Sequence, residues 1–97
     1  EENESDFLRK LSDLISDRKK NLPENSYTTF LFTKGTAKIA QKVGEEAVEV
    51  VIEALKNDQE RLINESADLL FHLLVLLEQQ NTSIEEVISC LKERHTE

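Results

Sequence analysis

The chain has 97 residues, of which 38% are hydrophobic, and its 12 basic and 20 acidic residues give a net charge of −8. This length allows one small domain with a modest core, and the acidic balance disfavours binding to nucleic acid or to an anionic membrane surface. Only 2 glycines and 1 proline are present, which argues against a turn-rich all-β fold. The single cysteine excludes an internal disulfide and a cysteine-based zinc site, and it favours a reducing, cytoplasmic location.

The chain begins with Glu1 and contains no methionine, so we expect either a missing start residue or a piece of a longer protein. Its acidic beginning does not resemble a signal peptide. The longest nearly apolar run, residues 69–77, is too short to span a bilayer. We therefore predict a single domain over residues 1–97, with residues 1–4 frayed.

The first predicted element is an amphipathic helix from Asp6 to Lys19 or Lys20, because apolar residues recur there at intervals of three and four. Pro23 breaks it. The segment 26–32 is ambiguous, since its β-branched and aromatic residues favour a strand but no partner strand is evident, and we interpret it as a helical turn and a half. A long helix is predicted next, over residues 36–55. Its expected core face consists of Ile39, Val43, Ala47, Val50, Val51 and Ala54.

A turn at Asn57-Asp58 precedes the next predicted helix, which runs to about Gln80, with Asn57 as its cap and Glu60 completing a capping box. A last helix begins after Ser83, with Glu86 as the capping-box partner. It is expected to turn Ile84, Val87, Ile88 and Leu91 inward, with Cys90 as a small packing residue.

The predicted fold is therefore all-α, an antiparallel helical bundle with four main helices and one short helical piece. The fourth of these elements is apolar nearly all round between residues 69 and 77. Such a helix must be covered nearly all round, and the other helices of one 97-residue chain could hardly do that. We therefore expect homodimerisation to complete the core.

Two rows of charged side chains follow the helical period. On the helix over residues 36–55, Lys42, Glu46, Glu49 and Glu53 fall in one stripe, with Glu45 at its edge. On the next helix, Glu65, Asp68 and His72 form a second stripe beside apolar residues. An acidic stripe is usually just solvated surface, but carboxylates with apolar neighbours are rarely left without a partner or a metal.

Folding these two helices into an antiparallel hairpin about Asn57 brings the two stripes into register. Glu49 then lies opposite Glu65, Glu46 opposite Asp68, and Lys42 opposite His72. Four facing carboxylates need a counter-charge, and oxygen-only ligands favour Mg²⁺ or Mn²⁺ over Zn²⁺. Because Mg²⁺ is commonly shared with substrate phosphates, the pattern predicts metal-assisted phosphoryl chemistry. Lysines that lead along the helix into this cluster could hold the phosphates: Lys34, Lys38 and Lys42.

Four motifs in this order resemble the phosphoribosyl-ATP pyrophosphatase family, the second enzyme of histidine biosynthesis. They are Ser26-Tyr27-Thr28, Gly35, the run K-V-G-E-E-A-V-E over residues 42–49, and the run E-S-A-D-L-L-F-H-L-L over residues 65–74. The E-E-x-x-E plus E-x-x-D pattern is similar to the wider all-α nucleoside triphosphate pyrophosphatases, the MazG-like superfamily. The resemblance covers about Phe7 to Arg94.

The resemblance implies a phosphoribosyl-ATP diphosphatase, an ATP-binding cytoplasmic hydrolase that cleaves the α–β phosphoanhydride of 1-(5-phosphoribosyl)-ATP. The products would be 1-(5-phosphoribosyl)-AMP and pyrophosphate. It further implies Mg²⁺ as cofactor, with Mn²⁺ as a substitute, a homodimer, and a fusion in which the chain is the C-terminal half beside a phosphoribosyl-AMP cyclohydrolase.

Carried over residue by residue, the resemblance implies three sets of site residues. The metal ligands would be Glu46, Glu49, Glu65 and Asp68. The catalytic residues would be Glu45, Glu46 and Glu49, with Glu45 ordering the attacking water or completing the ligand set. The substrate-binding residues would be Tyr27, Thr28, Lys34, Lys38, Lys42 and His72, with Ser26 contacting the substrate or shaping the pocket.

Two other functions fit the same residues. One is a housecleaning pyrophosphatase with the same metal chemistry and a different base pocket. The other is a non-catalytic helical dimerisation module, in which the acids are merely solvated.

Overall fold

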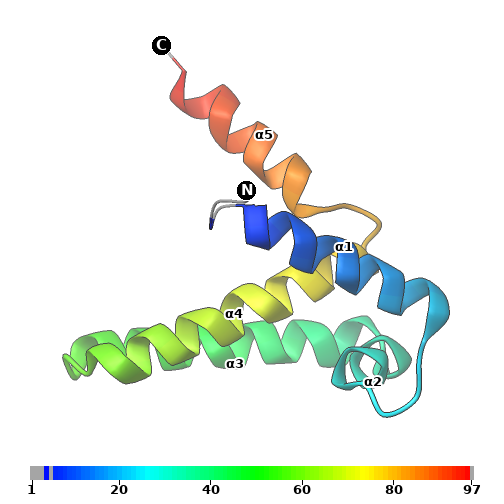
Figure 1. Cartoon of the computed structure of the whole chain (residues 1–97). Helices are drawn as coiled ribbons and strands as arrows, with labels where there is room; N and C mark the ends of the chain where they lie inside the picture. The colour runs from blue at the N-terminus through cyan, green and yellow to red at the C-terminus, as the bar shows by residue number, and fades with distance from the viewer. Residues whose placement is uncertain (1–3, 5, 97) are drawn as a thin grey trace.

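The computed structural model describes residue 4 and residues 6–96, and this part of the chain forms five helices and no strand (Figure 1). The helices are α1 (Asp6–Asn21), α2 (Tyr27–Lys34), α3 (Thr36–Leu55), α4 (Gln59–Gln79) and α5 (Ile84–His95). The predicted all-α class is confirmed, and the ambiguous segment is a helix of 8 residues. The predicted fraying of residues 1–4 falls mostly outside the described residues, although the Glu4 carbonyl accepts a hydrogen bond from the Phe7 amide at 3.2 Å.

The dominant feature is an antiparallel hairpin in which α3 and α4 lie side by side along most of their length (Figure 1). Helix α1 packs across the C-terminal part of α4, and α2 packs beside the start of α3. Helix α5 packs against α1 and points away from the hairpin. The predicted bundle of four main helices is therefore wrong for α5, because the turn after α4 directs this helix outward instead of back along the hairpin.

The core lies where α1 and α2 meet the hairpin, not along its whole length. Its buried side chains are Ile15, Leu31, Ile39, Leu74, Val75 and Ile84. Since α1 and α2 cover only this part of the hairpin, the end that carries the α3–α4 turn has no third helix over it.

Local sequence explains where the helices begin. The Ser26 side chain accepts a hydrogen bond from the Thr29 amide at 3.2 Å and caps α2. Gly35, with φ of 93°, connects α2 to α3 in a conformation that glycine adopts without strain. Helix α4 is capped by Asp58, which accepts from the Arg61 amide at 3.1 Å, so the predicted cap Asn57 is wrong by one residue. Ser83 is at the N-cap of α5 as predicted, but its side chain makes no capping hydrogen bond.

Several predicted core residues are exposed. Ile39 is buried, but Val51 is 57% exposed and Ala54 is exposed, whereas the acidic Glu53 between them is only 2% exposed. On α5, Leu91 and Cys90 are exposed as well. These residues lie on parts of α3 and α5 that extend beyond the helices able to cover them.

One consequence is an apolar face on the hairpin. It comprises Val48, Val51, Ile52 and Leu55 on α3, all exposed, and we call it the hairpin apolar face; Ile63 and Leu70 on α4 are exposed as well. Within the described residues, none of the helices combines the length and the hydropathy that crossing a bilayer would need.

Candidate metal centre

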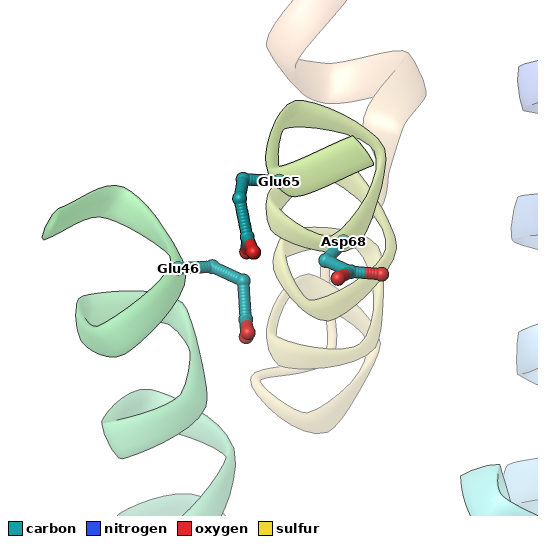
Figure 2. Close-up of side chains that lie close together, drawn as sticks. All are labelled: Glu46, Glu65 and Asp68. Carbon is teal, nitrogen blue, oxygen red and sulfur yellow. The ribbon is translucent and has the colours of Figure 1, made fainter. Parts of the chain in front are cut away.

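Three carboxylates from the two hairpin helices converge on one point. Glu46 reaches from α3 toward Glu65 and Asp68 on α4 (Figure 2). One oxygen of each lies within 4.8 Å of the other two, and these three are a group that could hold a metal ion. The predicted opposition of Glu46 and Asp68 across the hairpin is therefore confirmed in its geometry.

We call this group the acidic cluster. Its negative charges are poorly balanced by hydrogen-bond donors or positive charges. Oε1 of Glu46 is buried and has no hydrogen-bond partner, and the side chain as a whole is 12% exposed. Partial loss of solvent raises the pKa of Glu65, and the negative charges of Asp68, Glu49 and Glu46 raise it further. A divalent cation would satisfy both the unpartnered oxygen and the mutual repulsion, so the residues present fit a hard metal ion.

Glu49, the fourth predicted ligand, lies outside this tight group. Its carboxylate is nevertheless close enough to contribute to the raised pKa of Glu65. The expected opposition of Glu49 and Glu65 stays a prediction. No third helix of the described chain contributes a carboxylate to the group.

Glu45 is exposed and lies beside the cluster, not in it. It accepts a hydrogen bond from the Gln41 side-chain amide at 2.8 Å and pairs with the Lys42 ammonium at 3.4 Å. These hydrogen bonds, first from Gln41 and then from Lys42, lower the pKa of Glu45, so this carboxylate stays charged at neutral pH.

His72 connects α2 to the acidic cluster. Its Nδ1 lies 2.9 Å from the Asp68 carbonyl oxygen and 3.2 Å from Oε1 of Glu46, and its Nε2 lies 2.8 Å from the Tyr27 hydroxyl. A carbonyl oxygen can only accept, so Nδ1 carries a proton. In the neutral imidazole, Nε2 then accepts from the Tyr27 hydroxyl. The sequence placed His72 opposite Lys42 and did not predict the contact with Tyr27. The reason is that the prediction used positions along the helices and could not use the directions of the side chains.

Tyr27 forms part of a small aromatic group. Its ring packs against Phe30 and Phe71 at 6.1 Å between centroids and against the edge of His72 at 5.7 Å. Loss of solvent raises the pKa of Tyr27, and the nearby charge of Lys42 acts against this rise. The neighbouring Thr28 is partly buried, and Ser26 is occupied as the cap of α2.

The three predicted phosphate-binding lysines differ in their surroundings. Burial acts to lower the pKa of Lys42, but its hydrogen bond to Glu45 and the charge of Glu46 raise the pKa above the usual value. Lys38 is near enough to Glu45 to help lower the pKa of that carboxyl group. Lys34 lies over the Phe30 ring with its ammonium 5.6 Å from the centroid, and it belongs to the end of α2.

The sequence model of the phosphoribosyl-ATP pyrophosphohydrolase family matches residues 8–95. The histidine biosynthesis bifunctional protein HisIE of Buchnera aphidicola is 55% identical over 96 residues, which are 99% of this chain and 46% of that protein. The HisIE proteins of Vibrio cholerae and Halalkalibacterium halodurans are 52% and 55% identical, over 98% and 92% of this chain.

The chain spans only 42–46% of the length of these bifunctional relatives. The family match, in contrast, covers nearly the whole chain and includes the acidic cluster, Tyr27 and His72. The chain therefore belongs to the phosphoribosyl-ATP pyrophosphohydrolase family, which confirms the family and the enzyme class that its motifs resemble.

Proposed function

We propose that this domain hydrolyses 1-(5-phosphoribosyl)-ATP between its α- and β-phosphates, releasing 1-(5-phosphoribosyl)-AMP and pyrophosphate in histidine biosynthesis. The observation that carries the proposal is the convergence of Glu46, Glu65 and Asp68 from two helices in a chain of this family. The buried oxygen of Glu46 that accepts no hydrogen bond, beside two further carboxylates, supports a cation site, because burying an unpaired carboxylate is costly.

The proposed metal ligands are Glu46, Glu49, Glu65 and Asp68, with Mg²⁺ as the ion and Mn²⁺ as a substitute. All four offer only oxygen, which suits these hard cations. Glu46, Glu65 and Asp68 are already grouped, whereas Glu49 would need to turn its side chain toward them. When bound, the ion would neutralise charge on the triphosphate and on the departing pyrophosphate.

In the proposed reaction, the carboxylates at the edge of the cluster orient a water molecule for attack in line with the breaking phosphoanhydride bond. Glu45 is suited to accept a hydrogen bond from this water, because its carboxylate is exposed beside Lys42. Glu46 and Glu49 belong to both the catalytic and the metal-binding sets. Lys42, Lys38 and Lys34 hold phosphate oxygens through their ammonium groups.

On the other side of the cluster, we assign Tyr27, Thr28 and His72 to substrate binding. Tyr27 is 49% exposed, so its ring is accessible to a nucleotide base or a ribose. His72 is buried, its Nδ1 donates to the Asp68 carbonyl, and the same nitrogen lies 3.2 Å from Oε1 of Glu46. It would thereby orient one proposed ligand, as the partners of metal ligands commonly do.

We also propose that the hairpin apolar face binds a second copy of this chain. It carries Val48, Val51 and Leu55, each more than half exposed, along one side of α3. Exposed apolar patches of this kind mark interaction sites, and a face that pairs with itself about a two-fold axis closes the assembly. The cytoplasmic location and the fusion to a cyclohydrolase stay predictions, the latter supported by the bifunctional relatives.

The test is an assay of pyrophosphate release with Mg²⁺, comparing phosphoribosyl-ATP with a panel of ordinary nucleoside triphosphates. We expect strong preference for phosphoribosyl-ATP, whereas equal or better hydrolysis of the ordinary triphosphates would favour the housecleaning alternative.

The matching variant is Asp68→Asn, which keeps the size of the side chain but removes its charge. We expect a loss of turnover of at least about 100-fold with unchanged helical content, because a ligand of the catalytic ion is removed. The control is Glu60→Gln in the first turn of the same helix. A variant Asp68→Asn that retains full activity would contradict the assignment.

A further inference from the structure

Glu53 is the most buried carboxylate of the described chain, at 2% exposure, although the sequence places it in the same stripe as Glu46 and Glu49. Its Oε2 lies 3.4 Å from Nε of Arg61 on α4, and its Oε1 lies 4.0 Å from the ammonium of Lys56. Oε1 has no hydrogen-bond partner. Burying a carboxylate is costly unless it is paired, so the contact with Arg61 across the hairpin needs a reason.

Glu53 and Arg61 are one of several pairs of residues that lie opposite each other across the α3–α4 turn. Glu53 and Arg61 lie four residues before and after Asn57. Glu49 and Glu65 lie eight residues on either side of the same position, and Glu46 and Asp68 lie eleven. The pair nearest the turn therefore joins opposite charges, whereas the two pairs farther from the turn place like charges opposite each other.

Beyond this pair, α3 and α4 oppose carboxylates whose oxygens lie within 4.8 Å of one another, and like charges at that distance repel. Sliding one helix by a single residue would displace a ligand by about 1.5 Å along the axis and rotate it by about 100°. A metal site tolerates displacements of only about 0.5 Å. A contact that holds the helices in register close to the turn would therefore protect the geometry of the site.

We infer that Glu53 is a positioning residue, which by holding Arg61 across the α3–α4 turn sets the register in which Glu46 meets Glu65 and Asp68. Glu53 does not itself touch the acidic cluster. This inference rests on the proposed function, because it concerns the ligands of the proposed metal centre.

A simple charge effect and a contact that sets the register predict opposite changes in the Mg²⁺ affinity of Arg61→Gln. Arg61 lies one helical turn before Glu65 on α4, so its positive charge is close to the acidic cluster. If charge alone mattered, Arg61→Gln would bind Mg²⁺ more tightly and Glu53→Gln more weakly, and the double variant would resemble the parent. If register matters, both single variants and the double variant bind Mg²⁺ more weakly.

The experiment is a titration with Mg²⁺ alone, followed by calorimetry, for the full chain and for Glu53→Gln, Arg61→Gln and the double variant. We expect each to weaken Mg²⁺ binding about tenfold, as outer partners of metal sites do, with no further loss in the double variant. Lys56→Gln is the control, because Lys56 lies on the α3 side of the turn and does not bridge to α4. We expect its affinity to match the parent.

Binding by Arg61→Gln that is unchanged or tighter would overturn the inference. Arg61 is 61% exposed, so this variant tests it even if Glu53→Gln fails to fold. Asp68→Asn in the same titration separates a failure of the positioning role from a failure of the proposed metal centre. If Asp68→Asn loses Mg²⁺ binding and Arg61→Gln does not weaken it, the positioning role alone is wrong. If Asp68→Asn binds as the parent does, the proposed metal centre is wrong and the inference falls with it.

Discussion

At the scale of single residues, Glu65 shows how the acidic cluster acts on protein stability. Its pKa is raised by partial loss of solvent and by the charges of Asp68, Glu49 and Glu46. A carboxyl group with a raised pKa holds its proton more tightly in the folded state than in the unfolded state. Its ionisation therefore destabilises the fold, and the cluster is under electrostatic strain until a cation binds.

We predict a pH dependence from this shift for protein kept free of metal with a chelator. As pH rises from below the unfolded pKa through the raised folded pKa of Glu65, the stabilising contribution of the protonated form is lost. Glu65→Gln lacks this loss, so its melting temperature should rise relative to that of the parent across this pH range. Thermal denaturation of both proteins at intervals of about one pH unit, from about pH 3 to about pH 7, measures this difference in melting temperature, since ordinary carboxyl groups titrate within this range.

Glu45→Gln is a control with the opposite sign. Because the pKa of Glu45 is lowered, its charged form stabilises the folded state above the unfolded pKa, and this contribution is lost as pH falls through the folded pKa. The variant should therefore be slightly less stable than the parent at neutral pH and equal to it in acid. The same pH trend in both variants would contradict the assignment of the two shifts.

At the scale of helices, the turn between α3 and α4 decides which side chains meet. Asn57 adopts the left-handed conformation, with φ of 59°, and Asp58 caps α4. The sequence could not separate these roles, since Asn and Asp both serve as caps and both tolerate that conformation. Counting outward from the turn predicted the opposition of Glu46 and Asp68 nonetheless, because a shift of the cap by one residue leaves the turn itself in place.

The cap assignment leads to a prediction about stability. Asp58→Ala removes the hydrogen bond to the Arg61 amide at 3.1 Å and should lower the free energy of unfolding by about 1 kcal/mol. For a domain of this size the melting temperature would fall by about 4–8 °C. Asn57→Gly is the control, because glycine adopts a positive φ without strain and little change is expected. A larger loss in Asn57→Gly than in Asp58→Ala would favour Asn57 as the cap.

At the scale of the whole molecule, the core lies at the end of the hairpin that α1 and α2 cover, whereas the hairpin apolar face runs from the middle of the hairpin toward its turn. The nearly apolar run on α4 predicted that one chain cannot cover this helix. Within one chain the structure covers most of this run, since only Leu70 of residues 69–77 is exposed, and the apolar residues left exposed on the hairpin are those of the hairpin apolar face. This is the physical ground for the proposed second copy.

The predicted dimer can be tested with Val51→Asp, which places a charge in the centre of the hairpin apolar face. We expect the parent to run as a dimer in light scattering after size exclusion and the variant to run as a monomer with retained helicity. The reason is that burying an unpaired carboxylate opposes association. Ser89→Asp on α5 is the control and should stay dimeric. A parent that is monomeric at high concentration would contradict the proposal.

Metal binding should also be visible in the stability of the whole domain. A ligand that binds only the folded state stabilises it by about 2.7 kcal/mol at a concentration 100 times its Kd. Mg²⁺ should therefore raise the melting temperature of the parent, and Asp68→Asn should not respond. NaCl at the same ionic strength is the control, because a chain of net charge −8 is also stabilised by screening. Equal effects of both salts would count against a specific site.

The sequence by itself determined the helical class, the extent of the α3–α4 hairpin and the approach of Glu46 to Asp68, because helical period and turn position are local properties. It also indicated the family, because the motifs occur at specific spacings. Only the tertiary structure decided that Glu53 turns inward to Arg61, that His72 bonds to Tyr27, and that α5 leaves the hairpin. These depend on side-chain directions and on which helices cover which, and neither is encoded in the period of a single helix.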